Sequence, residues 1–469
     1  RLSGLPFFHK PPLFYWLTAL SLAVFGPHAW AARLASLLGA LFAVAGLYWF
    51  LRRYRHPQLA ALVSVVLVTQ PIFFAGAQFA NLDMLVAGLI SATILSAADT
   101  VARLRNRQPY RWVLLRTYAL AAGGVLAKGL IGLLLPGGVI IFWLLWRREW
   151  RLIGPLLSLT GAAAFLAIVA PWFVLMQHRY PGFYDYFVVY HHFRRFAETG
   201  FNNQFPVWFY LPVILVCALP WSPWLLRWLP SVIRRQWPAE EADDGVRSLM
   251  LIWFLLVVVF FSLPSSKLVG YILPAIPPFA YLIGEGFFIA WPKKLLATGR
   301  AYSVTLGLAA LFCVGLIAGV AFSDRHSSLL LARASEGVFQ PQDRVLLLHG
   351  YPYDLPFYLR LRQAPWVVGD WDDPEIDKHD NWRKELADAG KFDRTARAEH
   401  LLDTARLSAR ICHGFDKVLW VWGQEKSRAL TAWLPEQRIF HRAGKFTLWR
   451  LTPDDVRTLP LCSEKPSSG

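Results

Sequence analysis

Long apolar stretches without a single charged residue run through much of this chain. Two of them, Leu156–Met176 and Leu249–Leu263, contain no Asp, Glu, Lys or Arg. About 20 apolar residues are enough for one helix to span a bilayer. The chain of 469 residues is 55% hydrophobic, with a mean hydropathy of +0.37, whereas soluble domains are nearer to about 45–50% apolar. The sequence therefore predicts a polytopic membrane protein.

Much of the net charge of +17 lies in short loops between the apolar stretches. Basic loops mark the cytoplasmic side of a membrane protein. The positive charge therefore indicates membrane orientation, and no nucleic-acid partner is expected. The basic loops are residues 52–55, 103–116, 147–151 and 293–294.

These loops fix the expected path of the chain. It crosses the membrane about ten times, and Lys128 lies at an outer turn between two short helices. The other expected crossings are roughly Ala29–Leu51, Pro57–Phe79, Asn81–Val101, Leu152–Met176, Val207–Leu229, Leu249–Leu263, Tyr271–Ala290 and Ala301–Phe322. Residues His178–Phe205 form an outer loop and Arg234–Arg247 an inner one. Pro11–Gly26 is too short to cross and is expected to lie at the outer interface, so we expect a further membrane helix upstream of Arg1.

After about Ser323 the sequence becomes that of a soluble α/β domain. Asp343–Leu348 and Lys417–Trp422 are expected to be buried strands, with amphipathic helices at Asp380–Ala389 and Ala396–Leu407. A strand pair is expected over Gln437–Leu451. The predicted fold is therefore mainly α, with a transmembrane helical bundle over residues 1–322 and an outer α/β domain over 323–469.

The four cysteines fall into two groups. Cys217 and Cys313 lie in apolar runs, whereas Cys412 and Cys462 lie in the soluble domain. If that domain is periplasmic, the second pair can form a disulfide. Spacing alone does not establish the bond.

Several ionisable residues interrupt or border the apolar runs, and the expected topology puts all of them near the outer face. Such residues are expensive at membrane depth, which makes them candidates for function. A cluster of cations beside one leaflet suggests a site for an anionic, lipid-borne substrate. The residues are His9, Lys10, Asp83, Lys128, His191, His192, Arg194, Arg195 and Lys267.

Each candidate also has a structural interpretation. Lys10 could be a snorkelling anchor, although the two prolines that follow stiffen the backbone and lysine is a good partner for phosphate. Asp83 could cap a helix, or orient an acceptor or bind a sugar hydroxyl. The His191–Phe196 segment could belong to an aromatic belt with basic residues at the headgroups, or supply an arginine fork for phosphate and a histidine ligand for a metal.

The order of these motifs resembles that of the GT-C membrane glycosyltransferases. They are His-Lys-Pro-Pro-Leu-Phe-Tyr-Trp from residue 9, Asn-Leu-Asp-Met from 81, Ala-Lys-Gly-Leu-Ile-Gly from 127, His-His-Phe-Arg-Arg-Phe from 191 and Ser-Ser-Lys-Leu-Val-Gly-Tyr-Ile-Leu-Pro from 265. Within the protein-mannosyltransferase superfamily, the resemblance is to bacterial aminoarabinose transferases that modify lipid A. It covers residues 1–322.

The resemblance implies transfer of a sugar from undecaprenyl phosphate to lipid A or a related envelope acceptor, at the periplasmic face of the bacterial inner membrane. It assigns binding of the donor phosphate to Lys10, Arg195, Lys267 and Tyr271, and a catalytic role to Asp83. His192 matches a histidine associated with a metal such as zinc. The family usually has glutamate where this chain has His9, a residue type that still ligates zinc.

The principal catalytic aspartate of the family lies upstream of the Lys10 loop, and no residue here corresponds to it. We therefore expect this chain to be a fragment. Three alternatives remain: a GT-C enzyme for another sugar or a protein acceptor, a lipid-carrier transporter or flippase, and a non-catalytic membrane scaffold. Transporters often contain inverted repeats, and none is found in this sequence.

Overall fold

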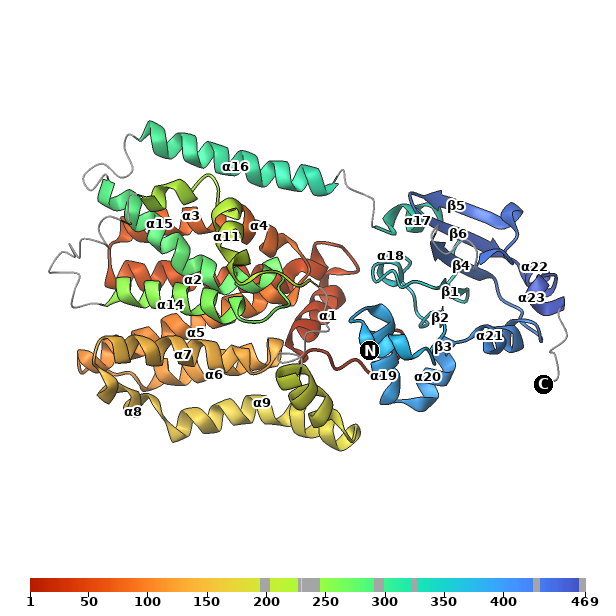
Figure 1. Cartoon of the computed structure of the whole chain (residues 1–469), viewed down its shortest axis with the longest axis horizontal. Coiled ribbons are helices and arrows are strands. Elements are labelled where there is room, and N and C mark those ends of the chain that lie inside the picture. Colours follow the sequence, from red (N-terminus) through yellow and green to blue (C-terminus); the bar gives the residue numbers. More distant parts are fainter. Residues whose placement is uncertain are drawn as a thin grey trace. The chain divides into compact units, whose positions relative to one another are not determined.

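The computed structural model describes residues 1–194, 203–226, 229, 245–290, 299–321, 327–424 and 431–463. It divides into two compact units (Figure 1). The membrane unit comprises Lys10–Gly319. The second, the C-terminal unit, comprises Val320–Gly469 together with Arg1–His9. A boundary near residue 322 was expected, but the packing of the first nine residues with the C-terminal unit was not.

The membrane unit is a bundle of helices. Its α-helices of eight residues or more are α1 (Leu13–Phe25), α2 (Leu34–Tyr54), α3 (Pro57–Val68), α4 (Pro71–Gln78), α5 (Leu82–Arg105), α6 (Arg111–Lys128), α7 (Ile131–Trp146), α9 (Leu159–Arg179), α11 (Tyr210–Cys217), α14 (Val246–Ser262), α15 (Ile276–Ala290) and α16 (Arg300–Ala321). The short α8 (Ile153–Leu156), a π-helical segment Asp185–Arg194 and the 3-10 helix η6 (Val269–Ala275) lie between them. The prediction of a mainly helical bundle with a small α/β domain is confirmed.

Two expected helices are interrupted. The stretch Pro57–Phe79 is broken into α3 and α4, which are bent by 65° relative to each other. Pro71 begins α4, and a proline disfavours helical backbone at the residue before it. Val207–Leu229 is likewise not one helix, because α11 ends at Cys217 and a 3-10 turn follows at Ser222–Trp224.

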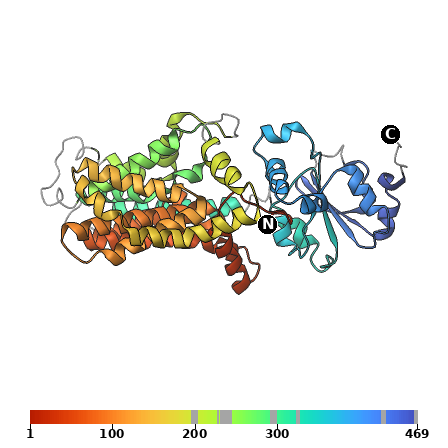
Figure 2. The same cartoon turned by 90° about the horizontal axis from the view of Figure 1, so that it is seen from below.

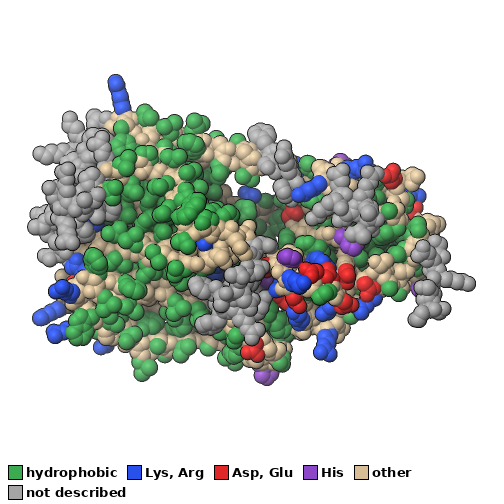
Figure 3. Space-filling model, viewed as in Figure 1, with side chains coloured by type: hydrophobic (Ala, Val, Ile, Leu, Met, Phe, Trp, Pro, Cys, Tyr) green, Lys and Arg blue, Asp and Glu red, His purple; other side chains and the backbone are tan. Residues whose placement is uncertain are grey.

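By length and composition, four described helical stretches can cross a membrane alone, and the bent pair α3–α4 makes a fifth. Shorter apolar helices, among them α7 and α14, occupy other expected crossings. Hydrophobic side chains cover much of the visible face of this unit (Figure 3). The multi-pass membrane character is therefore confirmed, whereas the number of about ten crossings stays a prediction.

Helix α5 lies at the centre of the bundle, where most of its side chains are buried. It approaches α2 closely at two glycines. A Cβ atom added to Gly88 would lie 1.9 Å from the carbonyl oxygen of Gly39. Small residues let membrane helices pack backbone against backbone. This contact positions α5, whose first turn contains Asp83.

Helix α1 projects sideways from one end of the bundle (Figure 2). Its apolar side chains Trp16, Leu20 and Val24 are more than half exposed. A helix of 13 residues that presents apolar side chains outward fits the predicted position at the membrane interface.

The expected inner loop Arg234–Arg247 lies mostly outside the described residues, but its last residue is helical. Arg247 belongs to the first turn of α14, and its side chain is 2% exposed. Its Nε donates to Glu285 Oε2 at 2.9 Å, and Arg55 Nη2 donates to Glu285 Oε1 at 3.0 Å. The loop assignment of Arg247 was therefore wrong, because a buried carboxylate on α15 pairs with it.

The C-terminal unit contains one six-stranded sheet with the order β3-β2-β1-β4-β6-β5. Strands β1 (Arg344–Leu348) and β4 (Leu419–Gln424) pair in parallel, as do β2 (Trp366–Val368) with β1 and β3 (Leu401–Leu402) with β2. The hairpin β5 (Ile439–Ala443) and β6 (Phe446–Leu451) adds two antiparallel strands. The predicted strands near residues 343 and 417 and the strand pair around Gly444 are thus confirmed.

Helices pack on both faces of this sheet (Figure 2). One face buries Val345 and Leu347 with Leu386 of α19 (Trp382–Lys391). The other buries Leu346 and Leu348 with Leu407 of α21 (Thr404–Ile411). The expected single helix Ala396–Leu407 was wrong, because the edge strand β3 separates α21 from α20 (Arg394–His400).

Residues 1–9 are part of the C-terminal unit. Leu5 is fully buried in the core that contains Leu331 and Val345, and the hydroxyl groups of Ser3 and Tyr351 are 2.8 Å apart. Gly4 has a φ of +79°, and a Cβ there would lie 2.5 Å from His400 Nε2. Glycine at this position allows both the positive φ of the backbone and the close approach of the His400 imidazole.

A disulfide joins Cys412 to Cys462, with the two Cα atoms 5.2 Å apart. It connects the end of α21 to the last described helix, α23 (Pro460–Ser463). The bond that the sequence left open is therefore present. Cys217 and Cys313 are free.

Acidification is expected to destabilise the C-terminal unit through His400. Burial lowers the pKa of this imidazole, as do nearby Arg344 and Arg410, although Glu399 opposes the change. The unfolded chain therefore binds a proton more readily than the folded one. The contribution of His400 to the free energy of unfolding should be fully present above about pH 6.5, the ordinary pKa of histidine. It should be lost progressively as the pH drops below that value.

The measurement is the thermal unfolding midpoint of the intact protein between pH 7.5 and pH 5.5. His400→Gln should reduce the slope against pH. His413→Gln, which changes an exposed histidine, should leave it unchanged. Equal slopes in all three proteins would contradict this prediction.

Candidate functional site

Asp83 lies in the first turn of α5, but it is not the residue that caps the helix. Asn81 precedes the helix, and its side chain accepts a hydrogen bond of 2.8 Å from the backbone N–H of Asp83. The backbone carbonyl of Asn81 in turn accepts a hydrogen bond from Ser36 of α2. Because Asn81 is the cap, the carboxylate of Asp83 is available for another partner.

That partner is Lys128, the last residue of α6. Its ammonium donates to Asp83 Oδ1 and lies 4.2 Å from the centroid of the Tyr271 ring. Asp83 is only 8% exposed, and the Lys128 side chain 13%. A cation in this position is stabilised both by the carboxylate and by the ring face. The first turn of α5, the end of α6 and η6 thus meet in one polar cluster.

The turn before Tyr271 closes over the same carboxylate. A Cβ atom at Gly270 would lie 2.8 Å from Asp83 Oδ2. The hydroxyl of Tyr210, at the start of α11, donates to the carbonyl of Leu268 at 2.9 Å. The Gly-Tyr pair of the Ser-Ser-Lys motif therefore packs on the Asn-Leu-Asp motif, although about 190 residues of sequence separate them.

Lys267 belongs to the neighbouring loop, and the residue is only 1% exposed. Its ammonium donates to the backbone carbonyl oxygens of Phe205 and Pro264, and its own N–H donates to Asn203 O at 3.0 Å. In this structure the lysine connects the segment around residue 204 to the turn before η6. Its predicted contact with a donor phosphate stays a prediction.

Lys10 directly precedes the two prolines that lead into α1. Leu13, three residues later, packs against a buried cluster that contains Ala122, Val125 and Leu126 of α6. Three residues span at most about 10 Å, so the backbone of Lys10 lies near the end of α6 that contains Lys128. The sequence prediction that the Lys10 and Asp83 motifs belong to one face of the protein agrees with this position.

The remaining predicted site residues fall partly outside the described residues. Arg195 lies outside them, as do the side chains of His191, His192 and Arg194. His9 is described in the C-terminal unit, where its ring stacks on Phe7 with centroids 4.7 Å apart. Among the described residues, no three His, Cys, Asp or Glu side chains are grouped as a metal site. Zinc binding by His9 and His192 stays a prediction.

This arrangement provides a buried carboxylate and a held ammonium beside an aromatic ring. An ammonium in a site of restricted water access stabilises negative charge that develops on a phosphate oxygen. The carboxylate of Asp83 holds the ammonium of Lys128 in position. The cluster can therefore bind an anionic group at the membrane surface and position a hydroxyl or amine beside it.

The sequence identified Lys128 as a suspect but did not pair it with Asp83. The signal that could have found the pair is the general behaviour of charged residues at membrane depth, which pair with one another. Asp83 and Lys128 were expected at the same outer face, and Asp83 is the one acidic residue among the candidates at that face.

The chain is similar in sequence to several known proteins. Residues 9–175 match the family described as dolichyl-phosphate-mannose-protein mannosyltransferase. A protein of Erwinia tasmaniensis, undecaprenyl phosphate-alpha-4-amino-4-deoxy-L-arabinose arabinosyl transferase, is 32% identical over 67% of this chain and 56% of its own length. The protein of the same name from Pseudomonas aeruginosa strain LESB58 is 34% identical over 60% of this chain and 50% of its own length. The chain thus spans about half the length of the curated relatives it matches.

The fold of this chain is also similar to that of a solved protein. The crystal structure of ArnT from Cupriavidus metallidurans bound to undecaprenyl phosphate covers 99% of this chain, with a TM-score of 0.76 and 22% identity, over 91% of the ArnT chain. The apo structure of the same protein gives a TM-score of 0.74, over 90% of its chain. The family match and the named relatives confirm the resemblance to the GT-C membrane glycosyltransferases of the protein-mannosyltransferase superfamily, and the two solved structures show that the fold is shared. Within that class, the named relatives are aminoarabinose transferases, as the motifs indicated.

Proposed function

We propose that this chain transfers a sugar from undecaprenyl phosphate to lipid A or a related envelope acceptor, at the periplasmic face of the bacterial inner membrane. The observation on which the proposal rests is the Asp83–Lys128–Tyr271 cluster, at the end of α5 where the charge of the loops predicts the outer face. The likeness in fold to ArnT and the similarity to aminoarabinose transferases support the same donor and acceptor.

In this proposal the cations of the site bind the phosphate of the donor. Lys10 and Arg195, as predicted, stabilise the charge that develops on the leaving lipid phosphate. Lys128 joins them as a third cation, oriented by Asp83 and Tyr271. An acceptor phosphate on lipid A is already ionised and needs little base catalysis, whereas a hydroxyl acceptor needs a carboxylate base. Metal binding by His9 and His192 stays a prediction and contributes to no step here.

The sugar and the acceptor are tested on lipid A itself. Lipid A is extracted from cells that lack the gene and from cells complemented with the intact gene or with Asp83→Asn. Mass spectrometry should detect an added aminopentose only with the unaltered gene. A different added sugar, or a glycosylated protein, would favour the alternative GT-C activity to which the mannosyltransferase family match points. Unchanged lipid A would contradict the proposal.

Lys10→Ala is expected to reduce transfer by the intact enzyme at least about 100-fold, because stabilisation of a developing charge typically contributes on the order of 10²–10³ in rate. Expression and the unfolding midpoint should stay as in the unaltered enzyme. Turnover of a radiolabelled undecaprenyl-phosphate sugar in detergent provides the measurement.

Lys10→Arg is the matched variant, since it keeps the positive charge. It should retain more transfer than Lys10→Ala. If Lys10 is only a snorkelling anchor, both variants should transfer sugar at a nearly normal rate, and Lys10 would then have no place in the mechanism.

A further inference from the structure

A second polar cluster lies on α5, at the opposite end from the candidate site. Its centre is Asp99, which follows Asp83 by 16 residues on the same helix. At 1.5 Å per residue the two carboxylates are about 24 Å apart along the helix axis. The basic loops predict that the Asp99 end faces the cytoplasm. The sugar-transfer site does not extend to this end of the helix.

A hollow of about 680 Å³ opens beside Asp99 between α2, α5 and α6. Its walls are mainly apolar and include Phe42 and Trp49 of α2, Leu95 of α5 and Leu120 of α6. The ring of Trp49 is 60% exposed, and the guanidinium of Arg52 lies 5.2 Å from its centroid. Tryptophan with an adjacent basic residue is typical of the headgroup level of a membrane.

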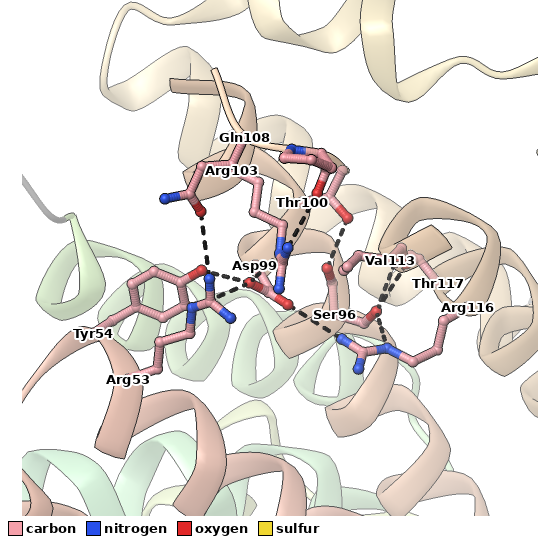
Figure 4. A network of polar contacts seen from close by, with 11 residues as sticks. Arg53, Tyr54, Ser96, Asp99, Thr100, Arg103, Gln108, Val113, Arg116 and Thr117 are labelled. Carbon is pink, nitrogen blue, oxygen red and sulfur yellow. Dashed lines mark hydrogen bonds and ion pairs between the residues drawn. The ribbon is translucent and has the colours of Figure 1, made fainter. Parts of the chain in front are cut away.

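The polar end of the hollow is organised by one carboxylate (Figure 4). Asp99 accepts a hydrogen bond from Tyr54, from Arg103 Nε at 3.1 Å and from Arg116 Nη2 at 3.4 Å, and Arg53 Nε is 4.0 Å away. Arg116 Nε also donates to Ser96 at 3.0 Å. Three arginines from three helices are thus held around one point.

The residues that line the hollow carry more positive than negative charge. Arg52, Arg53, Arg103 and Arg116 all line the hollow, and Asp99 is the one acidic residue among its lining residues. Elsewhere at this end of the bundle, Glu285 and Glu149 are each paired with two arginines. Both arginines at Glu285 are largely buried, whereas the side chains of Arg53 and Arg116 are 45% and 56% exposed.

The three held arginines also retain hydrogen-bonding capacity. A guanidinium has five N–H donors. Among the described residues, Arg53 Nη1, Arg103 Nη2 and Arg116 Nη1 have no hydrogen-bond acceptor, because the recorded bonds of these side chains use their other nitrogens. These nitrogens belong to side chains that line the hollow, and a guanidinium matches the geometry of a phosphate group.

We propose that this hollow binds an anionic diacyl phospholipid of the cytoplasmic leaflet. Its phosphate contacts Arg53, Arg103 and Arg116, and its acyl chains lie against Phe42, Leu95 and Leu120. The apolar walls favour a lipid over a free phosphate ion, which would gain nothing from them. Basic pockets between membrane helices on the cytoplasmic side are suited to such headgroups. The bound lipid joins α2, α5 and α6 at the end away from the sugar-transfer site.

The test compares lipid retention by the intact protein in detergent. Phosphatidylglycerol and phosphatidylcholine with the same acyl chains are added in equal amounts, and native mass spectrometry counts the lipid that stays bound. The unaltered protein should prefer phosphatidylglycerol. Arg53→Gln combined with Arg116→Gln should lower that preference on the order of tenfold, because each basic residue near an anionic membrane surface makes a sizeable contribution.

The control is Arg111→Gln combined with Arg151→Gln. It removes the same charge from two exposed arginines of the basic loops that do not line the hollow, and it should keep the preference. Equal retention of both lipids by the unaltered protein would overturn the proposal without any variant. An equal loss of the preference in the two double variants would also overturn it. The same holds if millimolar inorganic phosphate displaces phosphatidylglycerol, or if undecaprenyl phosphate at the same concentration is retained more strongly.

Discussion

Lys128→Met is expected to destabilise the membrane unit by about 3–5 kcal/mol and to abolish sugar transfer. The substitution keeps much of the side-chain volume but leaves the buried carboxylate of Asp83 without its cation. Removing one partner of a buried ion pair costs about that much, because the remaining charge stays desolvated. The stability change is measured by unfolding in mixed detergent, and transfer by donor turnover.

The double variant Asp83→Asn with Lys128→Met separates stability from chemistry. It removes both charges, so most of the lost stability should return. Transfer should stay absent, since the site then lacks both the carboxylate and the cation. Lys445→Met, at an exposed lysine of the C-terminal unit, is the control for loss of an ammonium group. A Lys128→Met enzyme as stable as the control would show that the ion pair is not important in the membrane.

Gly88→Ala is expected to destabilise the membrane unit by at least about 3 kcal/mol, at the upper end for overpacking. The added Cβ would lie 1.9 Å from the carbonyl oxygen of Gly39, and this contact is with backbone that has no rotamer to change. Helices α2 and α5 must then separate. Since α5 positions Asp83, and Ser36 of α2 bonds to Asn81, transfer should fall together with stability.

Gly137→Ala is the matched control, because a Cβ at this glycine of α7 meets no atom within 4 Å. Alanine is about 1 kcal/mol better than glycine inside a helix. This variant should therefore be as stable as the unaltered protein or more so. If Gly88→Ala and Gly137→Ala shift the unfolding midpoint in the same direction, the close contact between α2 and α5 does not limit stability.

The membrane helices were predictable where an apolar run is bounded by charge or a cap. Helix α5 is one case, because Asn81 precedes it and a basic loop follows Arg105. The break before Pro71 was missed because the run Pro57–Phe79 contains no charged residue and is mostly apolar, so that hydropathy outweighed the effect of the proline and of the polar pair Thr69-Gln70 before it. The short strands β2 and β3 were missed because two or three residues give no periodicity.

The candidate site was predictable in its members and less so in its contacts. The motifs identified Asp83 and Tyr271, which the structure brings together around Lys128. They did not indicate that Lys128 would pair with Asp83, nor that Lys267 would donate to two backbone carbonyls. Such pairings depend on how distant turns pack, which one sequence does not specify.

The position of Leu5 bears on the order in which the protein is made. Leu5 lies in the core formed by segments from Leu331 to Leu448. The membrane unit, which is more than 300 residues long, is therefore synthesised between Leu5 and the residues that Leu5 contacts. Contacts of such sequence separation form late. The C-terminal unit therefore cannot complete its core during early translation, because the segment 1–9 packs there only after the whole membrane unit and the later strands have been synthesised.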